Sequence, residues 1–304
     1  MKKLKIGLVL GGGGARGLAH IGVIKGLVRH GIPIHCVSGA SMGAIVGAAY
    51  ALFADIHKVE SVFKDFFTGE KYRALKGDSV DLSSVEEPED FFHFIAQVVK
   101  RRIVINMAVN RRGLISSDRL ETAIKYLIPN VKIEEMSIPF ACTALNLVSG
   151  KEYVFKKGKL HTALLASASI PGYLAPVKEN NFEWVDGAAI NNFPVEVCKQ
   201  MGAQFNIVCD VSAGLEEAKN FKNVIEVFIR THKAAVHKLN EKLLEKADFV
   251  LKPPIGDKKW TEFEKIDFFI QQGELAVEQN IKLLKKELKK RSGWFYNLKR
   301  KYLH

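Results

Sequence analysis

Residues 4–54 read LKIGLVLGGGGARGLAHIGVIKGLVRHGIPIHCVSGASMGAIVGAAYALFA, and this stretch decides the fold class. It predicts a strand over 4–10, a helix over 15–29, a strand over 34–38 and a helix over 42–53. Strands and helices that alternate in this way indicate a parallel sheet with helices on both faces. We therefore expect a three-layer α/β/α fold with a mostly parallel central sheet.

The same alternation returns after Gly113, beyond a segment of different composition. Helices are predicted over 117–127, 162–169, 195–201, 224–247 and 268–290, and strands over 140–145, 152–155, 183–186, 206–210 and 249–251. Residues 55–112 contain two Phe-rich pieces (63–67 and 91–94), an acidic loop (78–90) and a basic run (100–112). We interpret this segment as an amphipathic helical insertion, with a lid over the site as the alternative.

The motif Gly39-Ala40-Ser41-Met42-Gly43 lies between a predicted apolar strand and a predicted apolar helix. It fits the pattern G-x-S-x-G in the strand–turn–helix context that a nucleophilic serine needs. Gly39 and Gly43 permit a cramped turn that presents the Ser41 hydroxyl at the carboxyl edge of the sheet. A Gly- and Ser-rich buried turn without chemistry is the alternative, and the strand–helix setting favours the nucleophile.

The glycine run Gly11-Gly12-Gly13-Gly14-Ala15-Arg16-Gly17 follows the first strand. Its backbone N–H groups suit either a phosphate or an oxyanion. The run matches G-x-G-x-x-G from Gly12 to Gly17, but a dinucleotide site also wants an acidic residue about 20 positions on. Residues 1–54 contain no Asp or Glu, and the P-loop pattern is absent. We therefore favour an oxyanion hole.

The third motif is Asp186-Gly187-Ala188, which follows the strand-like residues 182–185. By itself an Asp-Gly pair most often marks a hairpin turn. A carboxylate at a strand end can serve as a base. We interpret Asp186 in this way only because the motif occurs together with the other two.

The three motifs in this order resemble the patatin-like phospholipase family, and the segment LGGGGARGLAHIGV is similar to its bacterial members and its neuropathy-target-esterase branch. Residues 167–172 are similar to the family's segment ahead of the third motif. The resemblance covers roughly residues 4–252, which we take as an acyl hydrolase domain. It is followed by a C-terminal helix and tail over 262–304.

This resemblance implies a phospholipase A, lysophospholipase or esterase with a Ser–Asp dyad, no catalytic histidine and no cofactor. Ser41 would be the nucleophile that forms the acyl-enzyme, and Asp186 the base. The oxyanion hole would use Gly12, Gly13 and Gly14, and the supporting residues would be Arg16, Gly17, Gly39, Gly43 and Gly187. An ordinary Asp has a pKa of about 3.9 and is a weak base, so a desolvated setting beside Trp184 and Val185 is needed.

Three alternatives stay open. An α/β-hydrolase triad runs Ser, acid, His, and only His232, His237 and His304 follow Asp186. None of them lies at a predicted strand end, and His20 is interpreted as a packing residue. The other two alternatives are a nucleotide-binding α/β protein and a lipid-binding or regulatory protein that keeps the fold with little turnover.

Composition is that of a soluble globular protein, with 47% apolar and 26% charged residues. Four cysteines occur without a CxxC pair, namely Cys36, Cys142, Cys198 and Cys209. We expect buried thiols, a reducing compartment and no metal site, hence a cytoplasmic protein. Residues 36–54 are free of charge over 19 positions, but their glycines and serines indicate a buried strand, turn and helix rather than a membrane span.

The formal net charge of +12 is concentrated near the C-terminus. Residues 282–304 hold nine Lys or Arg and one Glu, a net +8 (9 − 1), which leaves +4 (12 − 8) for the rest. A helix over 282–291 would have Leu283, Leu284 and Leu288 as its apolar side. Beyond it come Trp294, Phe295, Tyr296, Lys299, Arg300, Lys301 and Tyr302. We predict peripheral binding of 282–304 to an anionic inner membrane surface and no nucleic-acid partner, a solvated helix end being the alternative.

Overall fold

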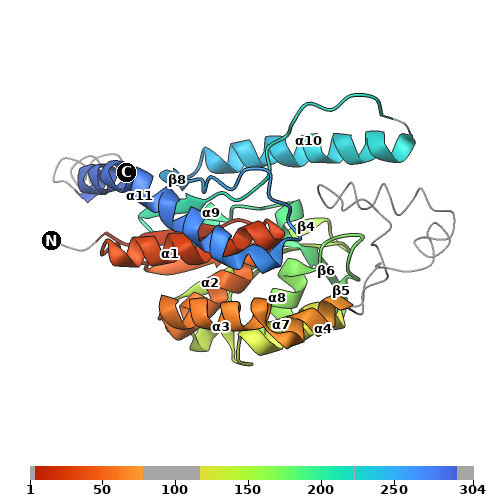
Figure 1. The fold of residues 1–304 in the computed structure, drawn as a ribbon, viewed down its shortest axis with the longest axis horizontal. Helices are drawn as coiled ribbons and strands as arrows, with labels where there is room; N and C mark the ends of the chain where they lie inside the picture. Colours follow the sequence, from red (N-terminus) through yellow and green to blue (C-terminus); the bar gives the residue numbers. More distant parts are fainter. Residues whose placement is uncertain (1–3, 78–116, 222, 293–304) are drawn as a thin grey trace.

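The computed structural model describes residues 4–77, 117–221 and 223–292 (Figure 1). One eight-stranded sheet has the order β5-β6-β3-β2-β1-β7-β8, and β4 pairs with β3 off this path. The strands are β1 (Ile6–Leu10), β2 (Cys36–Gly39), β3 (Phe140–Asn146), β4 (Lys151–Phe155), β5 (Val177–Glu179), β6 (Phe182–Asp186), β7 (Phe205–Cys209) and β8 (Phe249–Leu251). The run β3-β2-β1-β7-β8 is parallel, β4 and β6 each pair antiparallel with β3, and β5 pairs antiparallel with β6. The expectation of a mostly parallel sheet is confirmed.

Most of the predicted helices are present, with ends that differ by a few residues. The α-helices are α1 (Ala19–Arg29), α2 (Met42–Phe53), α3 (Ile56–Thr68), α4 (Glu70–Gly77), α7 (Asp118–Leu127), α8 (Leu160–Ala168), α9 (Val195–Gln200), α10 (Val224–Leu244) and α11 (Ile266–Ser292). Short 3₁₀ turns are η1 (Gly14–Leu18), η2 (Ile133–Glu135), η3 (Gly187–Ala189) and η4 (Phe263–Lys265). The helix predicted over 15–29 is therefore divided, because Gly14 takes a positive φ of 56° and η1 precedes α1.

Two hydrophobic cores lie on opposite faces of the sheet. Along β1, Leu8 and Leu10 belong to the larger core, which α1, α2, α8 and α11 cover. Val9, between them, belongs to the smaller core under α9 and α10, together with Leu243. Successive strand residues point to opposite faces, so a strand buried on both sides reads as a continuous apolar run. The three-layer expectation is confirmed.

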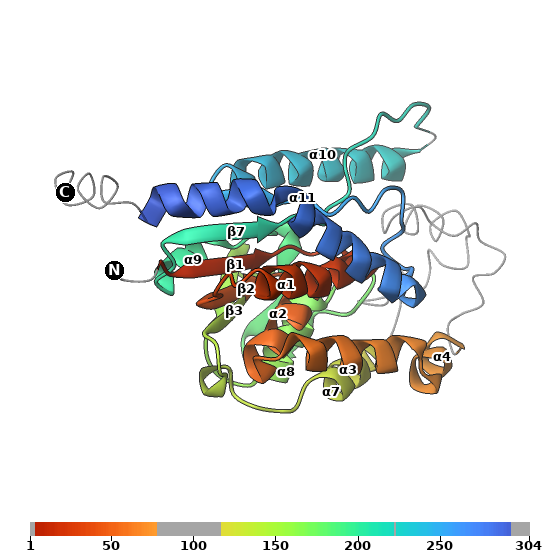
Figure 2. The same ribbon diagram turned by 60° about the vertical axis from the view of Figure 1, so that its left-hand side comes forward.

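The carboxyl ends of the parallel strands meet at one edge of the sheet, here called the carboxyl edge. β7 ends there, and β8 runs parallel to β7, so α10 must begin near the carboxyl edge and return to the opposite, amino edge. α11 also ends near the amino edge, where Arg291 Nη2 lies 3.3 Å from a carboxylate oxygen of Asp248, directly before β8. Figure 2 shows α10 and α11 running along the sheet in this way.

The predicted interfacial helix at the C-terminus needs correction. Leu284 is fully buried in the larger core and Leu288 packs against it, whereas Leu283 is 50% exposed. The apolar side expected to face a membrane thus mostly faces the protein. The aromatic and basic residues of 293–304 lie outside the described residues.

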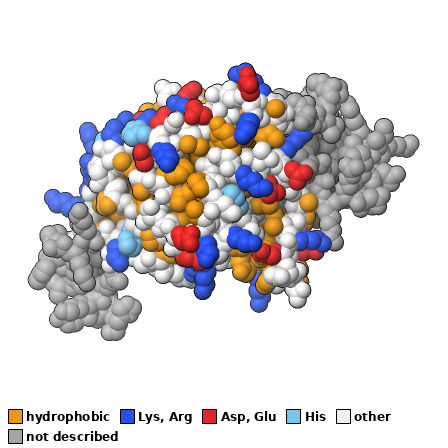
Figure 3. Space-filling view, turned by 90° about the horizontal axis from the view of Figure 1, so that it is seen from below, with side chains coloured by type: hydrophobic (Ala, Val, Ile, Leu, Met, Phe, Trp, Pro, Cys, Tyr) orange, Lys and Arg blue, Asp and Glu red, His pale blue; other side chains and the backbone are white. Residues whose placement is uncertain are grey.

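Two further expectations concern the insertion and the uncharged stretch. The first part of the insertion is helical, as α3 and α4, and residues 78–112 lie outside the described residues. Residues 36–54 form strand, turn and helix as expected. Among the helices described, none is long and apolar enough to cross a bilayer. The face in Figure 3 carries acidic and basic side chains interspersed with apolar ones.

Candidate active site

Ser41 occupies a strained turn between β2 and α2, with φ 54° and ψ −128°. A non-glycine residue held in such a region costs about 1–3 kcal/mol, so the surroundings must hold it there. The glycines of the motif explain how the turn fits. A Cβ on Gly39 would lie 2.7 Å from the carbonyl carbon of Gly43, and one on Gly43 would lie 2.6 Å from the carbonyl oxygen of Gly11. Both positions therefore exclude any side chain.

The end of α8 joins Ser41 to the third motif. The Ser41 N–H donates to the carbonyl oxygen and to Oγ of Ser167, both at 3.1 Å. Two residues on, the carbonyl oxygen of Ser169 accepts the Asp186 N–H at 2.9 Å. One short segment thus fixes the backbone of both predicted catalytic residues. Sequence reasoning noted residues 167–172 as a family-like segment but assigned them no task.

Asp186 reaches the carboxyl edge on an antiparallel strand. It ends β6, where it pairs with Ala144 of β3. The turn behind it requires glycine, because a Cβ on Gly187 would lie 2.6 Å from Oγ1 of Thr143. Asp186 is 5% exposed and Ser41 is 6% exposed, so the two side chains meet in a nearly buried setting.

The carboxyl group of Asp186 has the electrostatics that a general base requires. Burial raises its pKa to about 6, and hydrogen bonds from the Ser41 hydroxyl and the Ala188 N–H oppose that rise. The Ala188 N–H lies 2.8 Å from Oδ1. Ionised above pH 6, Asp186 is a stronger base than an ordinary Asp. The desolvated setting expected beside Trp184 and Val185 is present, since both are buried.

The glycine loop lies directly over Ser41. A Cβ on Gly12 would lie 3.0 Å from Cβ of Ser41 and 3.1 Å from Cβ of Ala188, so the three sequence motifs meet at one point. The Gly12 N–H donates to Oδ1 of Asn192 at 2.7 Å. Because that donor is already engaged, Gly12 shapes the loop, and the candidate oxyanion donors are Gly13 and Gly14.

Asn192 was missed by sequence reasoning. It is 3% exposed and follows the third motif by four residues. The pair Asn191-Asn192 looks like an ordinary turn in the sequence. Only the burial of the Asn192 side chain indicates a task, since buried polar side chains need partners.

His20 orders the glycine loop from beneath. Its Nε2 lies 2.7 Å from the carbonyl oxygen of Gly11, and the ring is fully buried. Burial lowers the pKa of His20 to about 4, against the opposing effects of the Gly11 carbonyl and of Asp210. The ring is therefore neutral at pH 7 and donates Nε2–H to Gly11. The expected packing residue thus also carries a hydrogen bond.

The outer side of the loop rests on Arg16 and Trp260. Arg16 Nε donates to the carbonyl oxygen of Gly13 at 3.4 Å, which agrees with the expected ordering role. The carbonyl oxygen of Trp260 accepts the Ala15 N–H at 2.7 Å. Gly17 packs on α2, where a Cβ would lie 2.6 Å from Cγ of Met42. Trp260 had no sequence signal, because it acts through its backbone.

A family model, Patatin-like phospholipase, matches residues 8–199. This chain belongs to the patatin-like phospholipase family. Within the family it is similar to Caenorhabditis elegans patatin-like phospholipase domain-containing protein ZK370.4, with 30% identity over 68% of this chain and 14% of that one. It is also similar to lysophospholipase NTE1 of Candida albicans, with 25% identity over 88% of this chain and 19% of that one.

A solved structure, VipD from Legionella pneumophila, aligns over 92% of this chain and 66% of that one, with a TM-score of 0.45 and 15% identity. The chain spans less than a fifth of the length of the two curated relatives named above. The predicted membership of the patatin-like phospholipase family is confirmed, and all three motifs that predicted it lie within the matched residues.

The two described histidines that follow Asp186 in this patatin-like protein lie on α10. His237 Nε2 lies 3.6 Å from a carboxylate oxygen of Glu241 on α10. His232 is exposed on the same helix, and His304 lies outside the described residues. Within the described ranges, no group of three or more His, Cys, Asp or Glu side chains is arranged to hold a metal ion.

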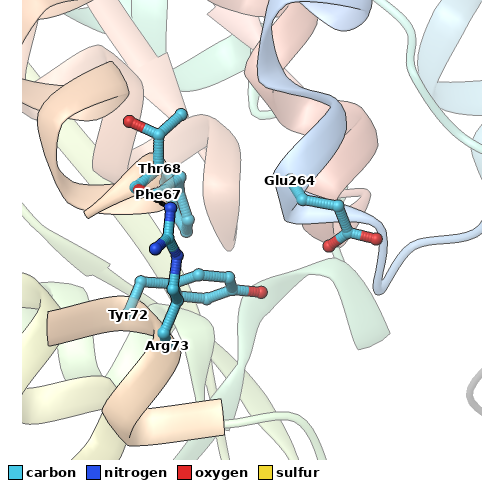
Figure 4. A pocket seen from close by; sticks show the side chains of 5 residues that line it. All are labelled: Phe67, Thr68, Tyr72, Arg73 and Glu264. Carbon is cyan, nitrogen blue, oxygen red and sulfur yellow. Dashed lines mark hydrogen bonds between the residues drawn. The ribbon is translucent and has the colours of Figure 1, made fainter. Parts of the chain in front are cut away.

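A pocket of about 290 Å³ lies between α3, α4 and η4 (Figure 4). It is lined by Phe67, Thr68, Tyr72, Arg73 and Glu264. Phe67 stacks on Phe263 at a centroid distance of 5.0 Å, and Arg73 Nη2 donates to the Thr68 carbonyl oxygen at 3.0 Å. None of the lining residues belongs to the predicted site.

Proposed function

We propose that this protein is a serine lipid acyl hydrolase, a carboxylic ester hydrolase of phospholipase A, lysophospholipase or esterase type. The observation that carries the proposal is the meeting of the three motifs at one point, where a Cβ on Gly12 would lie 3.0 Å from Cβ of Ser41 and 3.1 Å from Cβ of Ala188. Beside them lies Asp186, a buried carboxyl whose pKa is raised to about 6. Membership of the patatin-like family supports a lipid substrate. Residues 4–252 are proposed as the acyl hydrolase domain.

In the proposed reaction, Oγ of Ser41 attacks the acyl carbonyl carbon of the ester while Asp186 takes the hydroxyl proton. The negative charge that develops on the carbonyl oxygen is held by the N–H groups of Gly13 and Gly14. Collapse of this intermediate expels the alcohol, which receives the proton from Asp186, and leaves an acyl group on Ser41. Water then attacks the acyl-enzyme, again with Asp186 as base, and releases the fatty acid.

The strain at Ser41 supports this assignment. A serine held at φ 54° presents its hydroxyl at the start of α2, and the positive end of a helix dipole favours a nearby anion. In the glycine loop above Ser41, the N–H groups of Gly13 and Gly14 have no acceptor among the described residues. A binding protein without turnover would need neither a strained serine nor a base.

The decisive experiment compares the wild-type protein with Ser41→Ala and with Ser61→Ala, a control at an exposed serine on α3. A panel of phospholipids and lysophospholipids measures hydrolysis, and a fluorophosphonate measures labelling. We expect Ser41→Ala to lose both while circular dichroism stays unchanged, and Ser61→Ala to keep both. Turnover by folded Ser41→Ala protein equal to wild type would overturn the proposed nucleophile.

A further inference from the structure

Exposed apolar side chains gather at the carboxyl edge. Of twelve large hydrophobic side chains that are exposed in the described part of the chain, seven lie there. They form two groups. The α10 group is Phe221, Val224, Val227 and Phe228, and the hairpin group is Leu147, Val148 and Phe182. Large apolar groups in water are unfavourable, and their clustering marks an interaction surface.

The α10 group projects from the first turns of α10 and, at Phe221, from the loop just before it. Val224 is 84% exposed and Phe228 is 73% exposed, and Val227 and Phe221 are 50% and 46% exposed. Positions 224, 227 and 228 lie on one side of a helix, because residues three and four apart are neighbours. Figure 1 shows this end of α10 reaching past the sheet. The opposite side of the helix is buried, at Ile229 near this end and at Asn240 and Leu243 further on.

The hairpin group lies on the other side of the site. Leu147 (47% exposed) and Val148 (67% exposed) form the turn between β3 and β4. Phe182 begins β6, and its ring stacks on Trp184 at 5.2 Å. β3 continues past the pair Ala144–Asp186 before it turns, so the hairpin tip lies beyond the catalytic carboxyl.

The sheet order places Ser41 between the two groups. β3 and β6 carry the hairpin group, β2 and β1 carry Ser41 and the glycine loop, and β7 leads to α10. We propose that the carboxyl edge is a membrane-binding face, in which the α10 group and the hairpin group both insert into a lipid surface. A fluid lipid surface accommodates two separate apolar projections at once, because it has no fixed shape to match.

This inference rests on the proposed function, since an acyl chain held in a bilayer must reach a serine that is only 6% exposed. Insertion of side chains on both sides of Ser41 sets the opening of the site against the membrane. It also places the membrane at the end of the molecule opposite to the last turn of α11, where the basic tail begins.

The test uses the full chain with Ser41→Ala, so that binding is measured without hydrolysis. Co-sedimentation with phosphatidylcholine vesicles compares three proteins: this parent, the parent with Val224→Ser and Phe228→Ser, and the parent with Leu283→Ser. Leu283 is a matched control, because it is 50% exposed but lies towards the other end of the molecule. We expect the α10 variant to lose roughly tenfold or more in its partition coefficient, because two apolar side chains that would enter the lipid become polar.

A second arm separates this inference from the proposed function. In the protein that retains Ser41, the double substitution Val224→Ser and Phe228→Ser should lower hydrolysis of vesicle lipid. It should leave hydrolysis of a dissolved short-chain ester unchanged. If the protein that retains Ser41 cleaves neither substrate, the proposed function fails. The vesicle-binding measurement then still tests whether the carboxyl edge binds a membrane. Equal vesicle binding by the α10 variant and the Leu283 control would overturn the inference. So would sedimentation showing that the parent self-associates through the α10 group instead.

Discussion

The pKa of Asp186 determines how activity should vary with pH. Only the ionised carboxyl can accept the serine proton, so kcat/KM should rise with pH through a midpoint near 6 and reach a plateau above it. Asp186→Asn should lose about 10²–10⁴-fold in turnover, whereas Asp65→Asn on exposed α3 should keep the wild-type profile. A midpoint near pH 4 in a pH–rate profile would show that the base is another group.

The raised pKa of Asp186 also predicts how the stability of the protein depends on pH. The folded pKa of Asp186 lies above its ordinary value of 3.8, so the folded state binds more protons between the two values. Its contribution to stability is therefore full below pH 4 and is lost as the pH rises through 6. Asp186→Asn has no charge to bury, and we expect its urea midpoint at pH 8 to equal or exceed that of the wild type.

His20 gives a second test at the residue scale. His20→Ala removes the donor to the Gly11 carbonyl, and an unsatisfied buried acceptor costs about 1–3 kcal/mol. We expect a lower free energy of unfolding in urea, with residual turnover and an unchanged pH midpoint. His57→Ala, at an exposed position of α3, is the control. Complete loss of turnover without loss of stability would instead place His20 in the chemistry.

At the scale of elements, α1 and α11 approach so closely that glycine is required between them. A Cβ on Gly22 would lie 2.8 Å from the backbone nitrogen of Glu274, and one on Gly273 would lie 2.8 Å from that of Val23. Backbone atoms cannot yield as a flexible side chain can. This contact ties the C-terminal helix, expected to follow the hydrolase domain, to the helix below the glycine loop.

Gly22→Ala should therefore push the two helices apart and destabilise the protein by about 1–3 kcal/mol, the usual cost of overpacking. Gly214→Ala is the matched control, because a Cβ there meets nothing within 4 Å. Urea denaturation followed by circular dichroism measures both. Equal midpoints for the two variants would mean that α11 is not packed on α1 as described.

At the scale of the whole molecule, the last described turn of α11 and the proposed membrane-binding face lie at opposite ends. A truncation after Ser292 tests the tail without cutting the core, since Ile281 and Leu284 are buried. We expect it to reduce binding to anionic vesicles at low salt, because each Lys or Arg near such a surface contributes about 1 kcal/mol. Binding to phosphatidylcholine vesicles should not change. A comparable loss on both kinds of vesicle would make the tail the main anchor.

By itself the sequence determined the features that depend on neighbours along the chain. Periodicity predicted the strands and helices of residues 4–54, and the G-x-S-x-G pattern predicted the turn at Ser41, because steric exclusion by Gly39 and Gly43 acts over a few residues. The division of the first helix was missed, since the positive φ of Gly14 is not visible in apolar spacing.

Only the tertiary structure decided how the site is assembled. Ser167 bonds Ser41 across 126 residues, and Asn192 bonds Gly12 across 180. Asp186 arrives on an antiparallel strand whose register was not predictable. Such contacts depend on which strands pair and how helices pack, and local propensity contains no information about either. For the same reason, the sequence placed a membrane contact in the basic tail, whereas the fold gathers exposed apolar side chains on both sides of Ser41, which only packing could bring to one edge.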